Sequence, residues 1–489
     1  MSLSMEPVGS LQTPAAQRGS RIAVLRQDGE WILGIGRILV FAFLLVWLLF
    51  QNCMAATPDS KRETGDESPL ETLGLKWEWG GHFKQRLSAA WPHSGTTAAL
   101  SGVETQWDEG LELRITGGLS LWDRLRLEAH NESLLLFSES ATQSLKADEG
   151  LRTQGRNAAS FFAGGASAVP DDRRRFMDLT WTWEPGHPAV VVNRFDRLSA
   201  SFLGMGSSVT IGRQAITWGN GILFNPFDLF TPFAPTTLDR EYKQGEDAVL
   251  WQVAPGDRYG DGQLLLVPRR EPASRDLRWD QTSLAVKYRR GFDSIQSELT
   301  LLAGKHFNDV VGGVGATVQG KGAVWRFNVL YNALAGGDFS DFVSLVANVD
   351  YGWTWWGLNW YGSLEAFFSG VGVGPGDYGK ALSKTPLLER LERGELFVLG
   401  RHYLDAVLRV EIHPLVNVHL AIITNLQDPS GIVQPYVVWD ALQNVQIQLA
   451  ATLFWGGSNT EFGGFDPFPA APFDTHPPNS VLTWVTLHF

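Results

Sequence analysis

Hydrophobic and polar residues alternate along most of this chain with a period of two, which is the period of a β-strand and not of a helix. In the segment 111–116, for example, three aliphatic residues alternate with Glu112, Arg114 and Thr116. The same pattern recurs at 124–130, 325–333, 404–412 and 445–455. A soluble β-sandwich would also alternate, with its apolar face in the core. The pattern therefore predicts strands but does not distinguish a sandwich from a barrel.

The N-terminal region is typical of a secretory signal peptide. An uncharged apolar run at 38–50 follows a region with four arginines, Arg18, Arg21, Arg26 and Arg37. The run is too short for a membrane-spanning helix, which needs about 20 residues, and Met54-Ala55-Ala56 offers small residues for cleavage. We expect a signal peptide at 1–56 and a polar periplasmic lead-in at 57–74; an uncleaved anchor at 31–50 is the alternative.

The rest of the chain, 75–489, has features of a membrane barrel. Cys53 is the only cysteine and lies at or before the predicted cut, so the mature chain has no thiol for a disulfide. A closed barrel stabilises such a chain because every strand edge is paired. The chain has 20 Trp and 28 Phe, and the four tryptophans at 353–360 are typical of an interfacial girdle. These features predict an all-β fold, a transmembrane antiparallel β-barrel.

The pattern predicts nineteen candidate strands. They lie near 75–91, 104–121, 124–137, 173–184, 189–203, 207–218, 245–255, 260–270, 280–292, 294–307, 310–321, 323–336, 342–355, 358–370, 396–413, 415–427, 431–442, 445–457 and 479–489.

An odd strand count conflicts with a barrel whose two ends lie on one side of the membrane. Short and long connections alternate from the last strand back to about residue 207, but upstream the long stretch 138–172 falls on the side of the short turns. Either 173–184 or 189–203 is then a loop excursion, or two predicted strands are one. We predict eighteen strands, with sixteen as the nearest alternative. Eighteen strands leave an aqueous channel.

Two sequence blocks carry a family resemblance. The last strand places Val485, Leu487 and the aromatic Phe489 on one face, and this ending resembles the C-terminal strand of bacterial outer-membrane barrels. The blocks Ile211–Gly219 and Asn225–Asp228 resemble a broad group of proteobacterial porins that includes alginate-export-like members. The resemblance implies a porin in the outer membrane of a Gram-negative bacterium, in contact with lipid and lipopolysaccharide. It also implies that barrel-assembly machinery recognises Val485, Leu487 and Phe489.

The segment 219–244 is rich in Gly, Pro and aromatic residues and cannot form a paired central strand. Porins commonly fold one such loop into the lumen, so we hypothesise that it narrows the pore; an external loop is the alternative. Rings of charge set which solutes pass a constriction. The expected constriction residues are Asp239, Arg240, Glu241 and Lys243, with Arg213 supporting them from the wall. Arg213 shares a face with apolar residues unless a bulge intervenes.

Further charged positions are expected on the lumen wall. They are Arg114, Arg124, Arg126, Glu128, Arg326, Arg409 and Glu411. Their mixed signs suggest ion pairs along the wall more than strong selectivity. The run Arg173–Arg175 is either an anion-attracting vestibule or a solvated loop surface.

Charge and motifs exclude other functions. The formal charge is −12, and removing 1–56 (four Arg against Glu6, Asp28 and Glu30, net +1) leaves −13, which argues against nucleic-acid binding. There is no Gly-x-Ser-x-Gly elbow, Walker loop or His-Glu-x-x-His spacing. Six histidines fall on five predicted strands, without the spacing of a metal site: His82, His130, His306, His402, His413 and His419. We therefore expect no enzyme activity, no catalytic residues, no metal ligands and no cofactor.

Two functions remain. The first is passive diffusion of a small polar or anionic solute. The alternative is a barrel sheath around a multihaem cytochrome, which a partner would supply because the chain has no Cys-x-x-Cys-His. A sheath needs an open bore and a porin needs a constriction. The disposition of 219–244 therefore discriminates between them.

Overall fold

The computed structural model describes residues 74–100, 102–138, 169–186, 188–256, 259–336, 339–381, 385–466 and 474–489. The chain divides into two compact units, Met1–Ser68 and Pro69–Phe489. The predicted signal peptide at 1–56, Cys53 and the lead-in up to residue 73 lie outside the described residues. The second unit is almost entirely β-structure.

Its strands are β1 (Leu75–Trp91), β2 (Gln106–Leu121), β3 (Leu125–Ser138), β4 (Thr180–Gly186), β5 (Ala189–Gly204), β6 (Ser207–Gln214), β7 (Glu246–Val253), β8 (Asp261–Val267), β9 (Ser283–Phe292), β10 (Ser297–His306), β11 (Asp309–Gly320), β12 (Ala323–Ala333), β13 (Phe342–Trp355), β14 (Leu358–Ser369), β15 (His402–His413), β16 (Val416–Asn425), β17 (Ser430–Leu442), β18 (Val445–Trp455) and β19 (Asn479–His488). The helices are short: α2 (Thr97–Leu100), η1 (Asp293–Ile295), α5 (Tyr378–Ala381) and α6 (Thr385–Glu392). No helix among the described residues has the length and apolar character needed to span a membrane.

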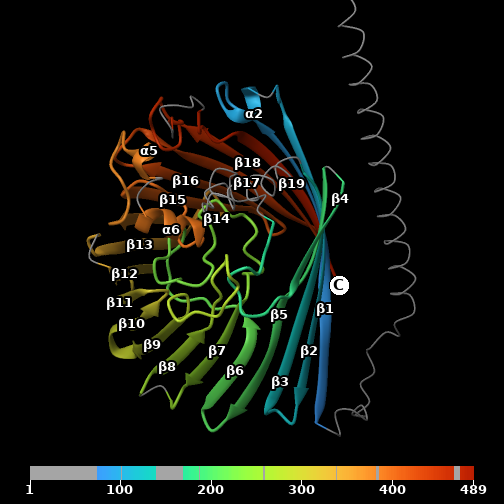
Figure 1. Cartoon of the computed structure of the whole chain (residues 1–489), viewed down its shortest axis with the longest axis vertical. Helices are drawn as coiled ribbons and strands as arrows, with labels where there is room; N and C mark the ends of the chain where they lie inside the picture. Colours follow the sequence, from blue (N-terminus) through green and yellow to red (C-terminus); the bar gives the residue numbers. More distant parts are fainter. Residues whose placement is uncertain are drawn as a thin grey trace, which may run out of the picture. The chain divides into compact units, whose positions relative to one another are not determined.

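All strands but β4 form one closed antiparallel barrel (Figure 1). Each strand pairs with the next along the chain, β3 pairs directly with β5, and β19 pairs back with β1. On its other edge, β5 pairs with β6 through residues 198–204 and with β4 through residues 191–194. The short β4 thus extends the edge of β5 beyond the end of β6. Leaving β4 out of the nineteen strands gives a barrel of eighteen.

The predicted strand number is confirmed, and β4 resolves the conflict upstream of residue 207. Because β4 does not cross the barrel, the connection from β3 to β5 falls at the end that carries the other long connections, between β6 and β7, β14 and β15, and β18 and β19. Short turns, such as those at 205–206, 321–322 and 356–357, join the strands at the opposite end. Some predicted strands were too long: β6 ends at Gln214, and β15 begins at His402.

The alternation separates two environments. On β2, Leu113 and Ile115 are 40% and 49% exposed, whereas the intervening Arg114 is only 2% exposed. The same contrast holds around the barrel, where the exposed large side chains are mostly aliphatic or aromatic and many buried ones are charged or amide. A barrel with an apolar outer band and a polar interior has this arrangement.

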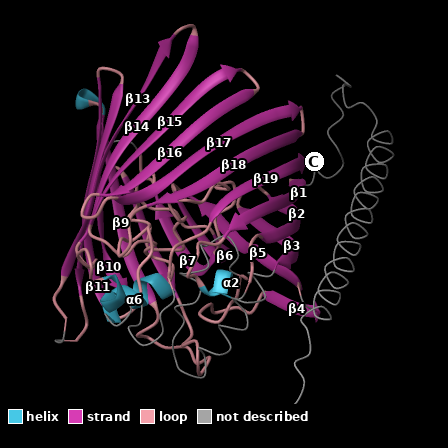
Figure 2. Ribbon diagram, turned by 90° about the horizontal axis from the view of Figure 1, so that it is seen from above, coloured by secondary structure: helices cyan, strands magenta, loops and turns pink. Residues whose placement is uncertain are grey.

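Two apolar clusters lie inside the barrel, where loops pack against the inward face of the strands. One includes Phe224, Phe367 and Leu387, and the other includes Trp218 and Phe227. Figure 2 shows α6 and the loop segments on the inner side of the strands. The interior is therefore partly filled by the chain's own loops.

Candidate functional site: the constricted lumen

The segment 215–245, between β6 and β7, lies within the ring of strands, where Figure 1 shows it in green. Asn220 bonds to Thr317 on β11 at 2.7 Å and accepts a hydrogen bond from Asn328 on β12 at 2.6 Å. Further along, the Thr236 carbonyl accepts a hydrogen bond from Gln434 on β17 at 3.1 Å. Asp239 then pairs with Lys84 on β1 at 2.5 Å. The segment thus contacts the wall on several sides of the lumen.

Glu365 on β14 anchors the first half of this segment. Its carboxylate accepts hydrogen bonds from the backbone N–H groups of Ile222, Leu223 and Phe224 at 2.7, 2.9 and 2.7 Å. Asn348 on the neighbouring strand donates a fourth at 3.0 Å. The Phe224 ring also stacks on Phe367, with centroids 4.4 Å apart. A buried carboxylate with this many donors is well satisfied.

The predicted constriction residues separate into two groups. Asp239 and Glu241 point toward the wall cation Lys84, at 2.5 and 3.8 Å, and remain partly exposed. The guanidinium of Arg240 bonds to the segment's own backbone and donates to the carbonyls of Thr237, Pro235 and Ile222. Lys243 is buried and does not line the pore.

Lys243 forms a buried ion pair with Asp228, in which its ammonium lies 2.5 Å from Oδ1 and also donates to the Ile216 carbonyl at 2.6 Å. Burial raises the pKa of Asp228 to about 6, although the pairing with Lys243 opposes that shift. Burial likewise lowers the pKa of Lys243. The hydrogen bond to Ile216 joins the two ends of the segment, and the ion pair ties its middle, at Asp228, to the second end.

Arg213 is also structural. The residue is 1% exposed, and its side chain donates to Asp247 on β7 at 2.7 Å, to Oδ2 of Asp172 at 3.2 Å and to the Met177 carbonyl at 2.8 Å. Gly212, immediately before it, has a φ of +119°, but the pairing continues without a register shift, so that Arg213 stands opposite Leu198 and Asp247. The hydrogen bonds link the wall to the segment that precedes β4. Arg213 therefore joins β7 to residues 172–177, and its hydrogen bonds among the described residues do not reach the segment 215–245, where the sequence placed its support.

Most of the predicted wall residues are held in ion pairs or ring contacts. Arg114 is buried between Glu132 at 2.6 Å and Asp196 at 2.7 Å, and the Tyr242 ring lies 4.3 Å from its guanidinium carbon. The other contacts are Glu128 with His130, Arg126 with Glu78, Arg326 with Asp350, Glu411 with Asn359, and Arg409 over the Tyr361 ring. The placement of Arg124 on the wall was wrong, because it lies exposed in the turn between β2 and β3.

A cavity of about 890 Å³ adjoins the segment on the side of the long loops. Its lining includes six arginines, Arg173, Arg174, Arg175, Arg194, Arg269 and Arg393, and six acidic residues, Asp171, Glu184, Glu246, Glu392, Glu395 and Glu461. Arg174 donates only a long hydrogen bond among the described residues, 3.5 Å to Gln281. Burial lowers its pKa, and the nearby charge of Arg393 lowers it further. Nη1 of Arg393 has no hydrogen-bond partner within the described part of the chain.

Arg174 and Arg393 can bind an anion, because guanidinium N–H donors bind carboxylates and phosphates in fixed geometry. The six acidic residues balance the six arginines in formal charge. Among them, Glu395 has its pKa lowered to about 2, because the charge and hydrogen bond of His306 and the charge of Arg393 outweigh the effect of burial. The run 173–175, which the sequence left undecided between vestibule and loop surface, thus lines the cavity. Sequence reasoning missed Arg269 and Arg393, which nothing local distinguishes from other loop arginines.

One group of side chains has the donor types of a metal site. His82, Glu241 and His488 each offer one nitrogen or oxygen atom, and the three atoms lie within 4.8 Å of one another. No motif in the sequence predicts this group, because its members are far apart along the chain.

The predicted insertion residues lie at the end of the barrel seam. Val485 and Leu487 belong to β19, and Phe489 follows it and exchanges backbone hydrogen bonds with Gly81 on β1, at 2.9 and 3.0 Å.

No protein-family model matches the chain, and no curated protein does. Solved structures do resemble it. OccAB2 of Acinetobacter baumannii is 11% identical, with a TM-score of 0.47 over 84% of this chain and 98% of that one. OpdK of Pseudomonas aeruginosa, crystallised with vanillate, is 8% identical with a TM-score of 0.44 and the same coverage. A BenF-like porin from Pseudomonas fluorescens is 9% identical, with a TM-score of 0.44 over 84% and 99%. None of the three is described as an alginate exporter.

Proposed function

We propose that this protein is an outer-membrane porin through which small polar or anionic solutes diffuse passively. The observation that carries the proposal is the segment 215–245, which contacts β1, β11, β14 and β17 and so crosses the lumen. A closed barrel with a polar interior and an inward-folded segment offers a water-filled path of limited width. The residues that face this path are Asp239 and Glu241 at the segment, both paired with the buried Lys84, with the arginine-lined cavity beside it.

The cytochrome-sheath alternative finds less support. A sheath requires a bore wide enough for a folded haem protein, whereas the two apolar clusters of the interior pack loops against the wall. These clusters include fully buried side chains such as Phe227 and Leu387. Emptying the lumen would expose them to water, at about 1.5–3 kcal/mol for each large side chain.

The same proposal places the chain in the outer membrane of a Gram-negative bacterium, with the exposed apolar side chains of the strands in contact with lipid. Its partners are then outer-membrane lipid, lipopolysaccharide and the barrel-assembly machinery. The proposed role is transport, and it requires no catalysis.

Planar-bilayer recording of the refolded chain tests the function. Wild-type protein should form discrete channels, and deletion of residues 222–240 should raise the single-channel conductance severalfold. An unchanged conductance would overturn the constriction, and a folded barrel with no channels would overturn the porin.

The reversal potential in a salt gradient tests the anion preference. The double variant R174Q/R393Q should shift selectivity toward cations, because it removes two charges from the cavity lining. Arg278→Gln is the matched control, since Arg278 is exposed and paired with Asp280. Equal shifts in the two variants would show that the cavity arginines do not select anions.

A further inference from the structure

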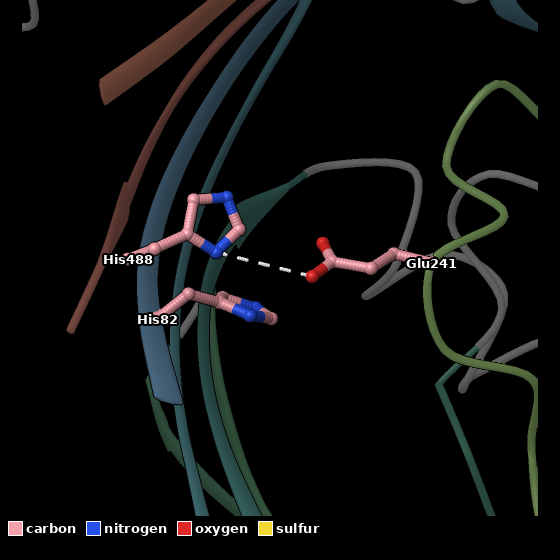
Figure 3. Close-up of side chains that lie close together, drawn as sticks. All are labelled: His82, Glu241 and His488. Atoms are coloured by element: carbon pink, nitrogen blue, oxygen red, sulfur yellow. Dashed lines mark ion pairs between the residues drawn. The ribbon is translucent and has the colours of Figure 1, made fainter. Parts of the chain in front are cut away.

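The barrel closes where β19 pairs with β1, and two histidines face each other across this seam. His82 and His488 are directly opposite in the register. Their rings lie 5.9 Å apart in an edge-to-face arrangement. Glu241, from the inward segment, reaches the same place, with Oε1 3.9 Å from Nδ1 of His488. Figure 3 shows the two rings and the carboxylate converging from three separate parts of the chain.

His82 is held in the form that a metal ligand requires. Its Nε2 lies 3.0 Å from Oε1 of Glu112. The arginines Arg86 and Arg114 flank this carboxylate at 3.5 and 3.8 Å. A carboxylate between two guanidinium groups accepts hydrogen bonds, so Nε2 of His82 carries the proton. Histidines that bind metals commonly donate their other ring N–H to a carboxylate in this way, which fixes the tautomer.

The other ring nitrogen of His82 is then left with a lone pair. The residue is 0% exposed, and its Nδ1 has no hydrogen-bond partner in the described part of the chain. Buried polar atoms normally have a partner, so an exception calls for an explanation. A metal ion beside the neighbouring Glu241 and His488 would supply the missing partner.

The donor set selects the class of metal. Two imidazole nitrogens and one carboxylate oxygen suit Zn²⁺ and related transition metals, whereas Ca²⁺ and Mg²⁺ prefer oxygen ligands. Zn–N bonds of about 2.0–2.1 Å place tetrahedral ligand atoms about 3.3 Å apart. The donor atoms now lie within 4.8 Å of one another, with 3.9 Å between Glu241 and His488, so binding requires a contraction of up to about 1.5 Å. Both side chains are partly exposed, 39% and 42%, and can rotate.

The nearest competing charge is Lys84, whose ammonium lies 3.8 Å from Oε2 of Glu241. Lys84 is paired more closely with Asp239, at 2.5 Å, which offsets its charge. The oxygen of Glu241 that faces His488 is the other one, Oε1. One carboxylate oxygen is thus directed toward the histidines while the second faces the lysine.

We propose that His82, Glu241 and His488 bind one divalent transition-metal ion, Zn²⁺ or a close analogue, which fastens the inward segment to the seam between the first and last strands. The ion would link β1, β19 and the segment 215–245. It would lie close to the ion pair between Asp239 and Lys84, which already connects the segment to β1. A fourth position stays open to water, as the site has three protein ligands. This inference does not depend on the porin function.

The test is metal binding to the tag-free, refolded chain in detergent. Calorimetry with Zn²⁺ and the visible absorption of Co²⁺ should each show a single class of site that binds one ion per chain. Glu241→Gln and His488→Gln should each weaken binding at least tenfold. His413→Gln is the matched control, because His413 is an exposed histidine on β15, away from the cluster.

Folding of each variant is checked by the heat-dependent shift in electrophoretic mobility that folded barrels show. As a second readout, excess Zn²⁺ should raise the thermal midpoint of the wild type, and should do so far less in Glu241→Gln, because binding to the folded state stabilises it by mass action. Absence of Co²⁺ binding by the wild type, or full affinity in either ligand variant, would overturn the site.

Discussion

Glu365 on β14 accepts a hydrogen bond from the backbone N–H of Phe224 at 2.7 Å and so joins the wall of the barrel to the segment that crosses it. The preceding N–H groups of Ile222 and Leu223 donate to the same carboxylate. One wall side chain therefore satisfies three consecutive donors of a loop that has no strand to pair with. This arrangement makes Glu365 the main polar anchor of the first half of the constriction.

Replacing Glu365 by Gln should loosen the segment. Glutamine keeps one acceptor oxygen but presents an amide donor to N–H groups that also donate. The loss of charged hydrogen bonds should lower the free energy of unfolding by about 3 kcal/mol and increase the current noise of single channels. Denaturant titration and bilayer recording measure the two effects. Glu411→Gln is the control, since Glu411 is only half-buried and makes one long contact with Asn359; equal losses in both variants would contradict the anchor role.

Neutralising Asp405 should raise the free energy of unfolding, whereas replacing Glu365 should lower it. Asp405 lies directly opposite Glu365 in the pairing of β14 with β15 and is 1% exposed. Neither of its carboxylate oxygens has a hydrogen-bond partner among the residues that the structure describes. Two neighbouring carboxylates with one set of donors repel each other, so Asp405→Asn should stabilise the barrel by about 1–3 kcal/mol.

The comparison for Asp405 is Asp350→Asn. Asp350 is paired with Arg326 at 2.8 Å and accepts the Tyr361 hydroxyl at 3.0 Å, so its neutralisation should destabilise the barrel. Denaturant titration of both variants under one condition shows whether each substitution raises or lowers the free energy of unfolding. A loss of stability in Asp405→Asn would show that the carboxylate has a stabilising partner after all.

Gly212 should tolerate no side chain. Its φ is +119°, and a Cβ atom placed there would lie 2.2 Å from the carbonyl oxygen of Leu198 on the paired strand. Gly212→Ala must therefore shift the backbone that presents Arg213 to Asp247, and should greatly reduce the yield of folded barrel. Gly320→Ala is the control, because a Cβ atom at that position meets nothing within 4 Å. Electrophoretic mobility with and without heating measures the folded fraction; similar yields would contradict the steric argument.

The sequence predicted the barrel because lipid and lumen impose opposite demands on alternate residues, and Leu113 and Arg114 show that alternation directly. It failed where the backbone departs from a regular strand. Arg213 is buried by contacts with residues 172–177, which lie far from it along the chain, and the short β4 looks like a spanning strand although it only extends the edge of β5. The alternation marks both places as irregular but does not show which distant segment each one meets.

The site was harder to predict than the fold because its contacts join distant parts of the chain. Glu365 meets Phe224 from a strand 141 residues away. His82 and His488 come together only because the last strand pairs with the first. Motif spacing detects metal ligands that share a helix or a loop, so the sequence analysis expected none here.

Glu461, in the connection between β18 and β19, predicts a dependence of stability on pH. Its carboxylate accepts hydrogen bonds from the Leu399 N–H at 2.5 Å, the Tyr403 hydroxyl at 2.5 Å and the Asn425 amide at 2.7 Å. Burial outweighs these bonds and raises the pKa of Glu461 from 4.5 to about 7. Because the folded state holds the proton more tightly, the contribution to stability is fully present below pH 4.5 and is lost as the pH rises through 7.

The shift of Glu461 corresponds to about 3 kcal/mol, which wild-type protein should lose between pH 5 and pH 8. Glu461→Gln cannot titrate, so relative to wild type it should become more stable by about that amount over the same range. The raised pKa of Asp228, about 6, acts in the same direction but is present in both proteins and cancels in the difference. Denaturant titrations at pH 5, 6.5 and 8 measure that difference, and parallel pH profiles for the two proteins would show that Glu461 is ionised throughout.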